Sequence, residues 1–115
     1  MNAAERLWRG LAAHDWYAVR SQFQPTAAVE WPHADRRMPV DEYVAVQRER
    51  AGPPIDVHRV VTEGRNVVVE ARAGDARCAG FYDLHDGLIA GAVEYWVGEA
   101  ALSAADRGRD PARSA

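Results

Sequence analysis

With 115 residues, 48% of them hydrophobic and 27% charged, the chain predicts one ordinary globular domain. The formal net charge of −3 and the scattered arginines argue against nucleic-acid binding, which needs a concentrated basic face. No apolar run approaches the ~20 residues that span a bilayer, and Met1 to Arg6 lack the apolar core of a secretory signal. We therefore expect a cytoplasmic protein with no membrane partner.

Two helices are predicted at the start of the chain. Residues 3–13 show the apolar spacing of an amphipathic helix, carried by Leu7, Trp8, Leu11 and Ala12. A second, short helix is predicted from Trp16 to Phe23, because Asp15 suits its N-cap and Pro25 ends it.

A short strand and a third helix follow. Residues 27–31 predict a strand that a proline stops, and residues 33–39 predict a polar, charged loop. The third helix starts at residue 40 or 41, exposes Arg48-Glu49-Arg50 and ends at Gly52-Pro53-Pro54.

The rest of the chain predicts four antiparallel strands joined by hairpin turns. The strands are Ile55 to Thr62, Asn66 to Ala73, Arg77 to Leu84 and Leu88 to Val97. Helices followed by a meander indicate an α+β domain over residues 1–98, in which the helices cover one face of a curved sheet. We expect residues 99–115 to form a largely disordered tail, since they are rich in Ala, Arg, Asp and Ser.

This order of elements carries three further motifs with a characteristic spacing. They are Ala13-His14-Asp15-Trp16, Val29-Glu30-Trp31-Pro32, and Phe81-Tyr82-Asp83-Leu84-His85-Asp86-Gly87 before Glu94-Tyr95-Trp96. Over roughly residues 3–97 the chain resembles the nuclear transport factor 2-like superfamily and is most similar to its small SnoaL-like proteins. The resemblance implies a cone-shaped fold that encloses one pocket and often forms dimers through the outer sheet face. Its members include polyketide cyclases, ketosteroid isomerases, dehydratases, epoxide hydrolases and non-catalytic proteins.

Two hairpin turns predict which side chains share a face of the sheet. With two-residue turns at Gly64-Arg65 and Gly74-Asp75, His58 faces Ala71 across the first hairpin. The inner face then carries His58, Val60, Thr62, Val67, Val69, Ala71, Cys78, Gly80, Tyr82 and Leu84. The outer face carries Arg59, Val61, Val68, Glu70, Ala79 and Phe81, with Arg59 opposite Glu70 as an ion pair.

The direction of Glu94 depends on the last hairpin. This carboxylate lies in an apolar strand, where it is costly unless it is paired or faces a polar cavity. A three-residue loop with a bulge at Gly87 pairs Leu84 with Leu88 and turns Glu94 inward. A two-residue Asp86-Gly87 turn sends Glu94 outward instead. We favour the bulged loop, because it leaves small residues mid-way along the inner face and an apolar outer face that suits a homodimer.

In that register Glu94 and His58 both point into the pocket, where a carboxylate and an imidazole can divide acid and base roles. Tyr82 is the candidate donor that orients a ligand. The alternative is structural: His58 is a satisfied half-buried residue, and Glu94 hydrogen-bonds a Trp or Tyr of the first helices. Further candidate ligand contacts are Trp31, His33, Tyr43, Cys78 and Trp96. No metal-site spacing supports zinc, and we expect no metal or other cofactor.

The sequence departs from the better-defined enzymes of the superfamily. Trp31 stands where ketosteroid isomerases carry their general-base Asp, and Leu7 and Gly80 fall near the positions of their oxyanion-binding Tyr and Asp. The resemblance therefore excludes isomerisation by that route. The inner face also lacks the Asp-Arg-Asp group of limonene-type epoxide hydrolases.

We expect a SnoaL-like cyclase, isomerase or dehydratase that acts by acid/base chemistry on a small apolar, aromatic or polyketide-like molecule. A non-catalytic ligand-binding or assembly module with the same cavity is the alternative, and a protein-interaction subunit that uses the outer face is a third.

Overall fold

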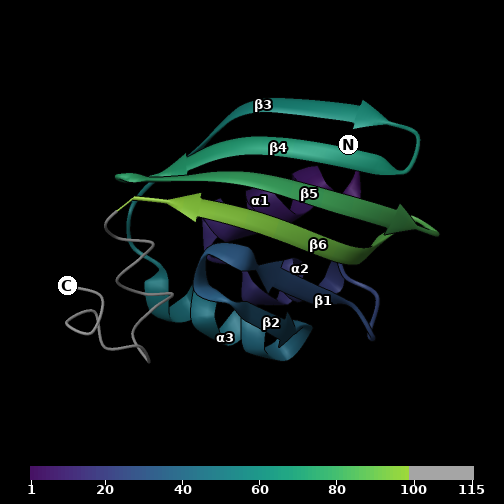
Figure 1. Cartoon of the computed structure of the whole chain (residues 1–115), viewed down its shortest axis with the longest axis horizontal. Helices are drawn as coiled ribbons and strands as arrows, with labels where there is room; N and C mark the ends of the chain where they lie inside the picture. The colour runs from purple at the N-terminus through teal and green to yellow at the C-terminus, as the bar shows by residue number, and fades with distance from the viewer. Residues whose placement is uncertain (99–115) are drawn as a thin grey trace.

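The computed structural model describes residues 1–98, and the tail expected over 99–115 lies outside the described residues. Within that range the chain forms three α-helices, one 3-10 helix and six strands (Figure 1). The helices are α1 (Ala3–Ala13), α2 (Trp16–Ser21), the 3-10 helix η1 (Pro32–Ala34) and α3 (Val40–Arg50). The strands are β1 (Ala28–Trp31), β2 (Arg36–Pro39), β3 (Ile55–Glu63), β4 (Asn66–Ala73), β5 (Ala76–His85) and β6 (Leu88–Val97).

The three predicted helices are confirmed, with one difference at the end of α2. Asp15 caps α2, since its side chain accepts a hydrogen bond of 3.0 Å from the backbone N–H of Ala18. The helix ends at Ser21 because the next residues pair with β6 instead. The backbone N–H of Ile89 donates to the carbonyl of Gln22 over 2.8 Å, and Phe23 forms an isolated bridge to Ile89.

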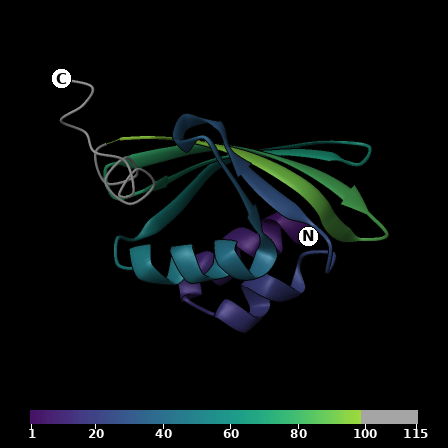
Figure 2. The same cartoon turned by 60° about the horizontal axis from the view of Figure 1, so that its bottom comes forward.

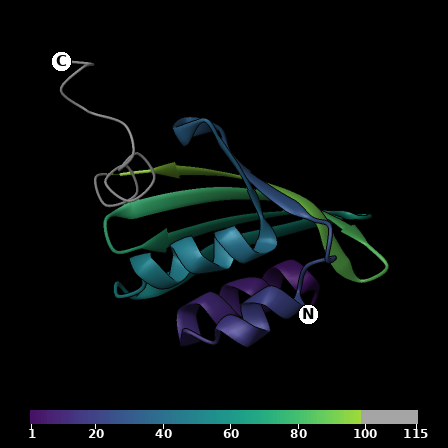
Figure 3. The ribbon, with the colours of Figure 1, turned by 90° about the horizontal axis from the view of Figure 1, so that it is seen from below.

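All six strands belong to one curved sheet, in the order β2-β1-β6-β5-β4-β3. Neighbouring strands are antiparallel except β1 and β6, which are parallel. The helices α1, α2 and α3 all lie on one face of this sheet, which we call the inner face (Figures 2 and 3). No described helix has both the length and the apolar character to cross a membrane.

The polar loop predicted over residues 33–39 is wrong, because this segment contains the end of η1 and the edge strand β2. Asp35 adopts a left-handed conformation with φ 53°, which reverses the chain directly after η1. Residues 36–39 can then run back along β1, where Met38 pairs with Val29.

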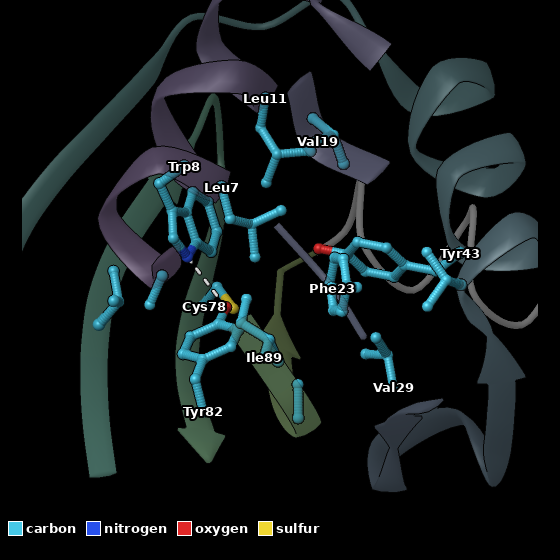
Figure 4. Packing of buried hydrophobic residues seen from close by; sticks show 14 of the residues in the cluster. Leu7, Trp8, Leu11, Val19, Phe23, Val29, Tyr43, Cys78, Tyr82 and Ile89 are labelled. Atoms are coloured by element: carbon cyan, nitrogen blue, oxygen red, sulfur yellow. Dashed lines mark hydrogen bonds between the residues drawn. The ribbon is translucent and has the colours of Figure 1, made fainter. Parts of the chain in front are cut away.

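A core of buried apolar residues fills the space between the helices and the inner face (Figure 4). Leu7, Trp8 and Leu11 come from α1, and Val19 comes from α2. They meet Ile89 and the other buried residues of the strands, so the amphipathic pattern identifies the buried side of the first helix at these three positions. Ala12, the fourth residue of the predicted apolar side, is exposed instead.

The register of the first hairpins agrees with the prediction at most positions. Arg59 pairs with Glu70, and their side chains form an ion pair of 3.6 Å. The prediction for His58 is wrong: Val57, not His58, pairs with Ala71. A bulge between Val57 and Arg59 leaves His58 without a partner on β4, and its side chain is exposed.

The last hairpin turns Glu94 inward by a different route from the predicted one. Asp86 and Gly87 form a two-residue turn with φ 52° and 80°, and the three-residue loop is therefore wrong. A bulge at Ala90 follows, because β5 pairs with Ile89 and then with Gly91. Because of this extra residue the later side chains of β6 return to the predicted faces of the sheet, so Glu94 lies on the inner face as predicted. Its partner is Gly80, whereas the predicted register would have paired it with Cys78.

Candidate functional site

Glu94 is 0% exposed, and its carboxylate accepts four hydrogen bonds from side chains. Oε1 accepts from the indole N–H groups of Trp31, over 3.0 Å, and Trp96, over 3.1 Å. Oε2 accepts from the hydroxyl groups of Tyr43, over 2.9 Å, and Tyr82, over 2.6 Å. We call these five residues the Glu94 cage. It brings together side chains of β1, α3, β5 and β6.

A second layer of donors fixes the direction of the hydrogen bonds in the cage. The indole N–H of Trp8 donates to the Tyr82 hydroxyl over 2.9 Å, and the Gln47 amide donates to the Tyr43 hydroxyl over 3.1 Å. These two groups only donate, so both tyrosine oxygens act as acceptors toward them and direct their own protons to Glu94. Four incoming donors match the acceptor sites of an ionised carboxylate.

Gly80 allows the close approach that completes the cage. It faces Glu94 across β5 and β6, and the Tyr82 ring lies over it. A Cβ at position 80 would lie only 2.3 Å from the Tyr82 hydroxyl oxygen. Glycine is therefore required here by the position of a neighbouring side chain rather than by its backbone conformation.

Burial and the charge of Glu94 act together on the ionisable groups around the cage. Burial, reinforced by the Glu94 carboxylate, raises the pKa values of Tyr43 and Tyr82 well above their ordinary value. The same two causes raise the pKa of the Cys78 thiol. The tyrosines therefore remain protonated donors at neutral pH, and Cys78 is a protonated thiol with low nucleophilicity.

These raised pKa values predict a loss of stability in alkaline solution. In the unfolded chain Cys78 and the two tyrosines ionise near 9.0 and 10.0, whereas the folded protein keeps them protonated. The unfolded state therefore releases protons first, so the free energy of unfolding should fall as the pH rises above about 9. Denaturant titrations from about pH 7 to about pH 10.5 measure this, and Tyr82→Phe should show a shallower fall. A stability that stays constant over this interval would contradict the assignment.

Arg50, at the end of α3, covers the indole side of the cage. Its guanidinium lies 4.2 Å from the ring centroid of Trp96 and 5.1 Å from that of Trp31. The prediction that Arg50 is exposed is wrong, because its side chain is half-buried. Burial lowers the pKa of Arg50, and the attraction of Glu94 opposes this shift.

The predicted site residues fall into three groups. Glu94, Tyr82, Trp31, Tyr43 and Trp96 meet in the cage. Cys78 and His33 lie beside it: Cys78 pairs with Trp96 across the strands, and the His33 ring lies 5.6 Å from that of Trp31. His58 stays apart from Glu94 on the exposed bulge, so the expected carboxylate–imidazole pair does not form.

Trp8, Gln47 and Arg50 were missed as members of the site. Tyr43, Gln47 and Arg50 follow the i, i+4, i+7 spacing of one helix face, which was a usable signal for two of them. Trp8 carried no comparable signal, because its spacing also fits a purely apolar helix face.

The cage is closed in this conformation. Its five residues are at most 3% exposed, so their side chains border almost no space that admits a water molecule. The chain's own aromatic rings thus occupy the part of the predicted pocket next to Glu94. Among residues 1–98, no group of three or more His, Cys, Asp or Glu side chains is placed to hold a metal ion.

No protein-family model and no curated protein matches this sequence. Solved structures do match. A nuclear transport factor 2-like protein of unknown function from Burkholderia xenovorans LB400 is 20% identical, with a TM-score of 0.75 over 84% of this chain and 81% of that one. A SnoaL-like protein of unknown function from Burkholderia thailandensis is 15% identical, with a TM-score of 0.72 over 83% and 92%.

The chain has the nuclear transport factor 2-like fold. An LEH-like epoxide hydrolase from M. tuberculosis shares this fold at 19% identity, with a TM-score of 0.65 over 92% of this chain and 88% of that one. The resemblance expected from the sequence is therefore confirmed for the fold. Solved structures with this fold have similar sequence identity to this chain whether or not an activity is assigned to them. The activity of this chain must therefore be argued from its own residues.

Proposed function

We propose that the protein is a cofactor-independent enzyme of the cyclase, isomerase or dehydratase type, in which Glu94 moves a proton on a small, largely apolar substrate. The Glu94 cage is the observation that carries this proposal. A fully buried carboxylate is expensive in so small a domain, and among residues 1–98 no side-chain cation hydrogen-bonds to it. An apolar side chain in place of Glu94 would pack between the strands and helices without the cost of burying a carboxylate.

The hydrogen-bond pattern suggests how the cage would act on a substrate. If the Tyr82 hydroxyl donated its hydrogen bond to a substrate oxygen instead of to Glu94, one acceptor site on Oε2 of Glu94 would become free. Glu94 could then remove a proton from the carbon next to that oxygen-bearing carbon, while Tyr82 stabilises the enolate. Tyr82, with Tyr43 beside it, thus takes the partner role that the sequence suggested for His58.

Access requires a covering side chain to move, because the cage is closed. Arg50 is the partly exposed residue over Trp31 and Trp96, and its displacement would open the indole side. The expected absence of a cofactor and the cytoplasmic location remain predictions from the sequence.

Proton abstraction by Glu94 can be tested with 5-nitrobenzisoxazole, whose ring opens when a base removes its carbon-bound proton. We expect the protein to accelerate the opening on the order of a hundredfold over an equal concentration of acetate. Glu94→Gln should abolish the acceleration, and Tyr82→Phe should retain it in part. Glu70→Gln, at a partly exposed glutamate on β4, is the matched control and should leave the rate unchanged.

Equal rates for Glu94→Gln and the unmodified protein, measured below the melting temperature of both, would contradict the enzyme proposal. So would a rate no higher than that of acetate.

The outer face of the sheet favours a second function, as a dimeric binding or assembly module. Val61, Phe81 and Tyr95 are 51%, 45% and 45% exposed there, and the last two rings pack edge to face with centroids 5.9 Å apart. A depression of about 420 Å³ on this face includes Val68, Phe81 and Val93 in its lining. We propose that a second copy of the chain covers this apolar surface, in either function.

A further inference from the structure

The solvent side of the two cage indoles carries three basic side chains. Arg50 covers both rings, the Arg36 guanidinium lies 6.0 Å from the Trp31 centroid, and the His33 ring lies 5.6 Å from it. All three are partly exposed, whereas the cage beneath them is buried. This cluster is unexpected in a chain whose formal net charge is −3.

The two arginines differ in their partners. Arg36 is neutralised by Glu42, with 2.6 Å between Nη2 and Oε2. Nη1 of Arg50 is buried and has no hydrogen-bond partner within the part of the chain that the structure describes. A buried N–H group without an acceptor costs free energy, and more so on a charged group. Arg50 therefore has donor capacity that the protein leaves unused.

We propose that Arg50 binds the carboxylate of a planar aromatic acid, whose ring packs against Trp96 and Trp31 next to the Glu94 cage. This inference rests on the proposed function, because it names the substrate class of the same site. The guanidinium fork matches a carboxylate in shape, and the two indoles offer a flat apolar surface once the guanidinium turns toward its ligand.

Charge also selects the position of the ligand carboxylate. Glu94 is already negative and has accepted all the donors of the cage, so a second carboxylate beside it would be repelled and would lack donors. The Arg50 guanidinium above the indoles is instead the place where the ligand carboxylate gains attraction, because Arg36 is already paired with Glu42. The ring would thus point toward the cage and the carboxylate toward solvent. The buried environment that lowers the pKa of Arg50 makes pairing with an anion more favourable.

The test compares two flat probes of nearly equal shape, 2-naphthoate and its neutral analogue 2-naphthamide, by isothermal titration calorimetry. We expect the full-length protein to bind the acid at least about tenfold more tightly than the amide, since hydrogen bonds between charged groups are the stronger ones. Arg50→Gln should remove this preference by weakening only the acid. Arg50→Lys, which keeps the charge and loses the fork, should retain part of it and covers the case in which the glutamine variant does not fold.

Arg48→Gln is the matched control, because Arg48 lies on the same helix and is exposed. It should keep the preference of the unmodified protein. Equal affinity for both probes, or a preference that survives in Arg50→Gln, would overturn the role of Arg50 while the proton-transfer proposal stands. No binding of either probe at millimolar concentration would overturn the inference as well, and the ring opening of 5-nitrobenzisoxazole would then report separately on Glu94.

Discussion

Glu94→Gln should lower the free energy of unfolding by about 2–6 kcal/mol, in addition to its effect on activity. The amide oxygen can accept the two indole N–H groups, but the amide NH₂ then faces the two tyrosine hydroxyls. Those hydroxyls already accept from Trp8 and Gln47, so their protons lose their acceptor inside the core. Each unsatisfied buried donor costs about 1–3 kcal/mol, a large share of the ~5–15 kcal/mol that holds a domain together.

Chemical denaturation followed by tryptophan fluorescence measures this loss. Glu70→Gln makes the same chemical change at a solvent-accessible ion pair in which Glu70 is partly exposed, and it should alter stability by less than about 0.5 kcal/mol. A double-mutant cycle with Tyr82→Phe should reveal coupling with Glu94, because Phe removes one of the two stranded hydroxyls. A loss below about 0.5 kcal/mol for Glu94→Gln would show that the hydrogen bonds of the cage do not stabilise the fold.

Much of the fold could be predicted because its local signals agree with one another. The apolar spacing of residues 3–13, the capping side chain of Asp15 and the Gly-containing turns each specify one conformation. The edge strand β2 was missed because its four residues, Arg36 to Pro39, lack the apolar alternation of a strand. It forms because Asp35 reverses the chain beside β1, a long-range consequence that local propensity does not encode.

The face of the sheet on which each side chain lies was harder to predict than the strands themselves. A bulge moves every later side chain of a strand to the opposite face of the sheet. The residue types of Val57-His58-Arg59 and those around Ala90 do not indicate a bulge. The bulge in β3 made the inner placement of His58 wrong. At Glu94 a second bulge compensated for a wrongly assigned turn, so the predicted direction was correct although its reason was not. The presence of an acid in an apolar strand was the more dependable signal for the site, because a buried carboxylate is stable only when other groups donate hydrogen bonds to it.

Gly80→Ala should also destabilise the protein strongly, although it adds only a methyl group. The new Cβ would lie 2.3 Å from the Tyr82 hydroxyl oxygen and 2.6 Å from the ring carbon Cε2. Tyr82 is 2% exposed, and relieving this contact would shift its ring away from residue 80 and break its hydrogen bonds to Glu94 and Trp8. Overpacking of about 1–3 kcal/mol then adds to the cost of the stranded polar groups, and we expect a total of roughly 2–5 kcal/mol.

Gly91→Ala is the matched control, because it adds the same methyl group to the neighbouring strand β6. Apart from its two chain neighbours, no residue in the range 1–98 has a heavy atom within 4 Å of that methyl group, and Gly91 has no left-handed φ. It should change the free energy of unfolding by less than about 1 kcal/mol, with either sign. The ring opening of 5-nitrobenzisoxazole separates the two variants a second time, since only Gly80→Ala moves the donor that faces Oε2 of Glu94. If the two alanine variants were equally stable and equally active, the close approach of Tyr82 to residue 80 would have no role in holding the carboxylate, and the cage would have to be held by its indoles alone.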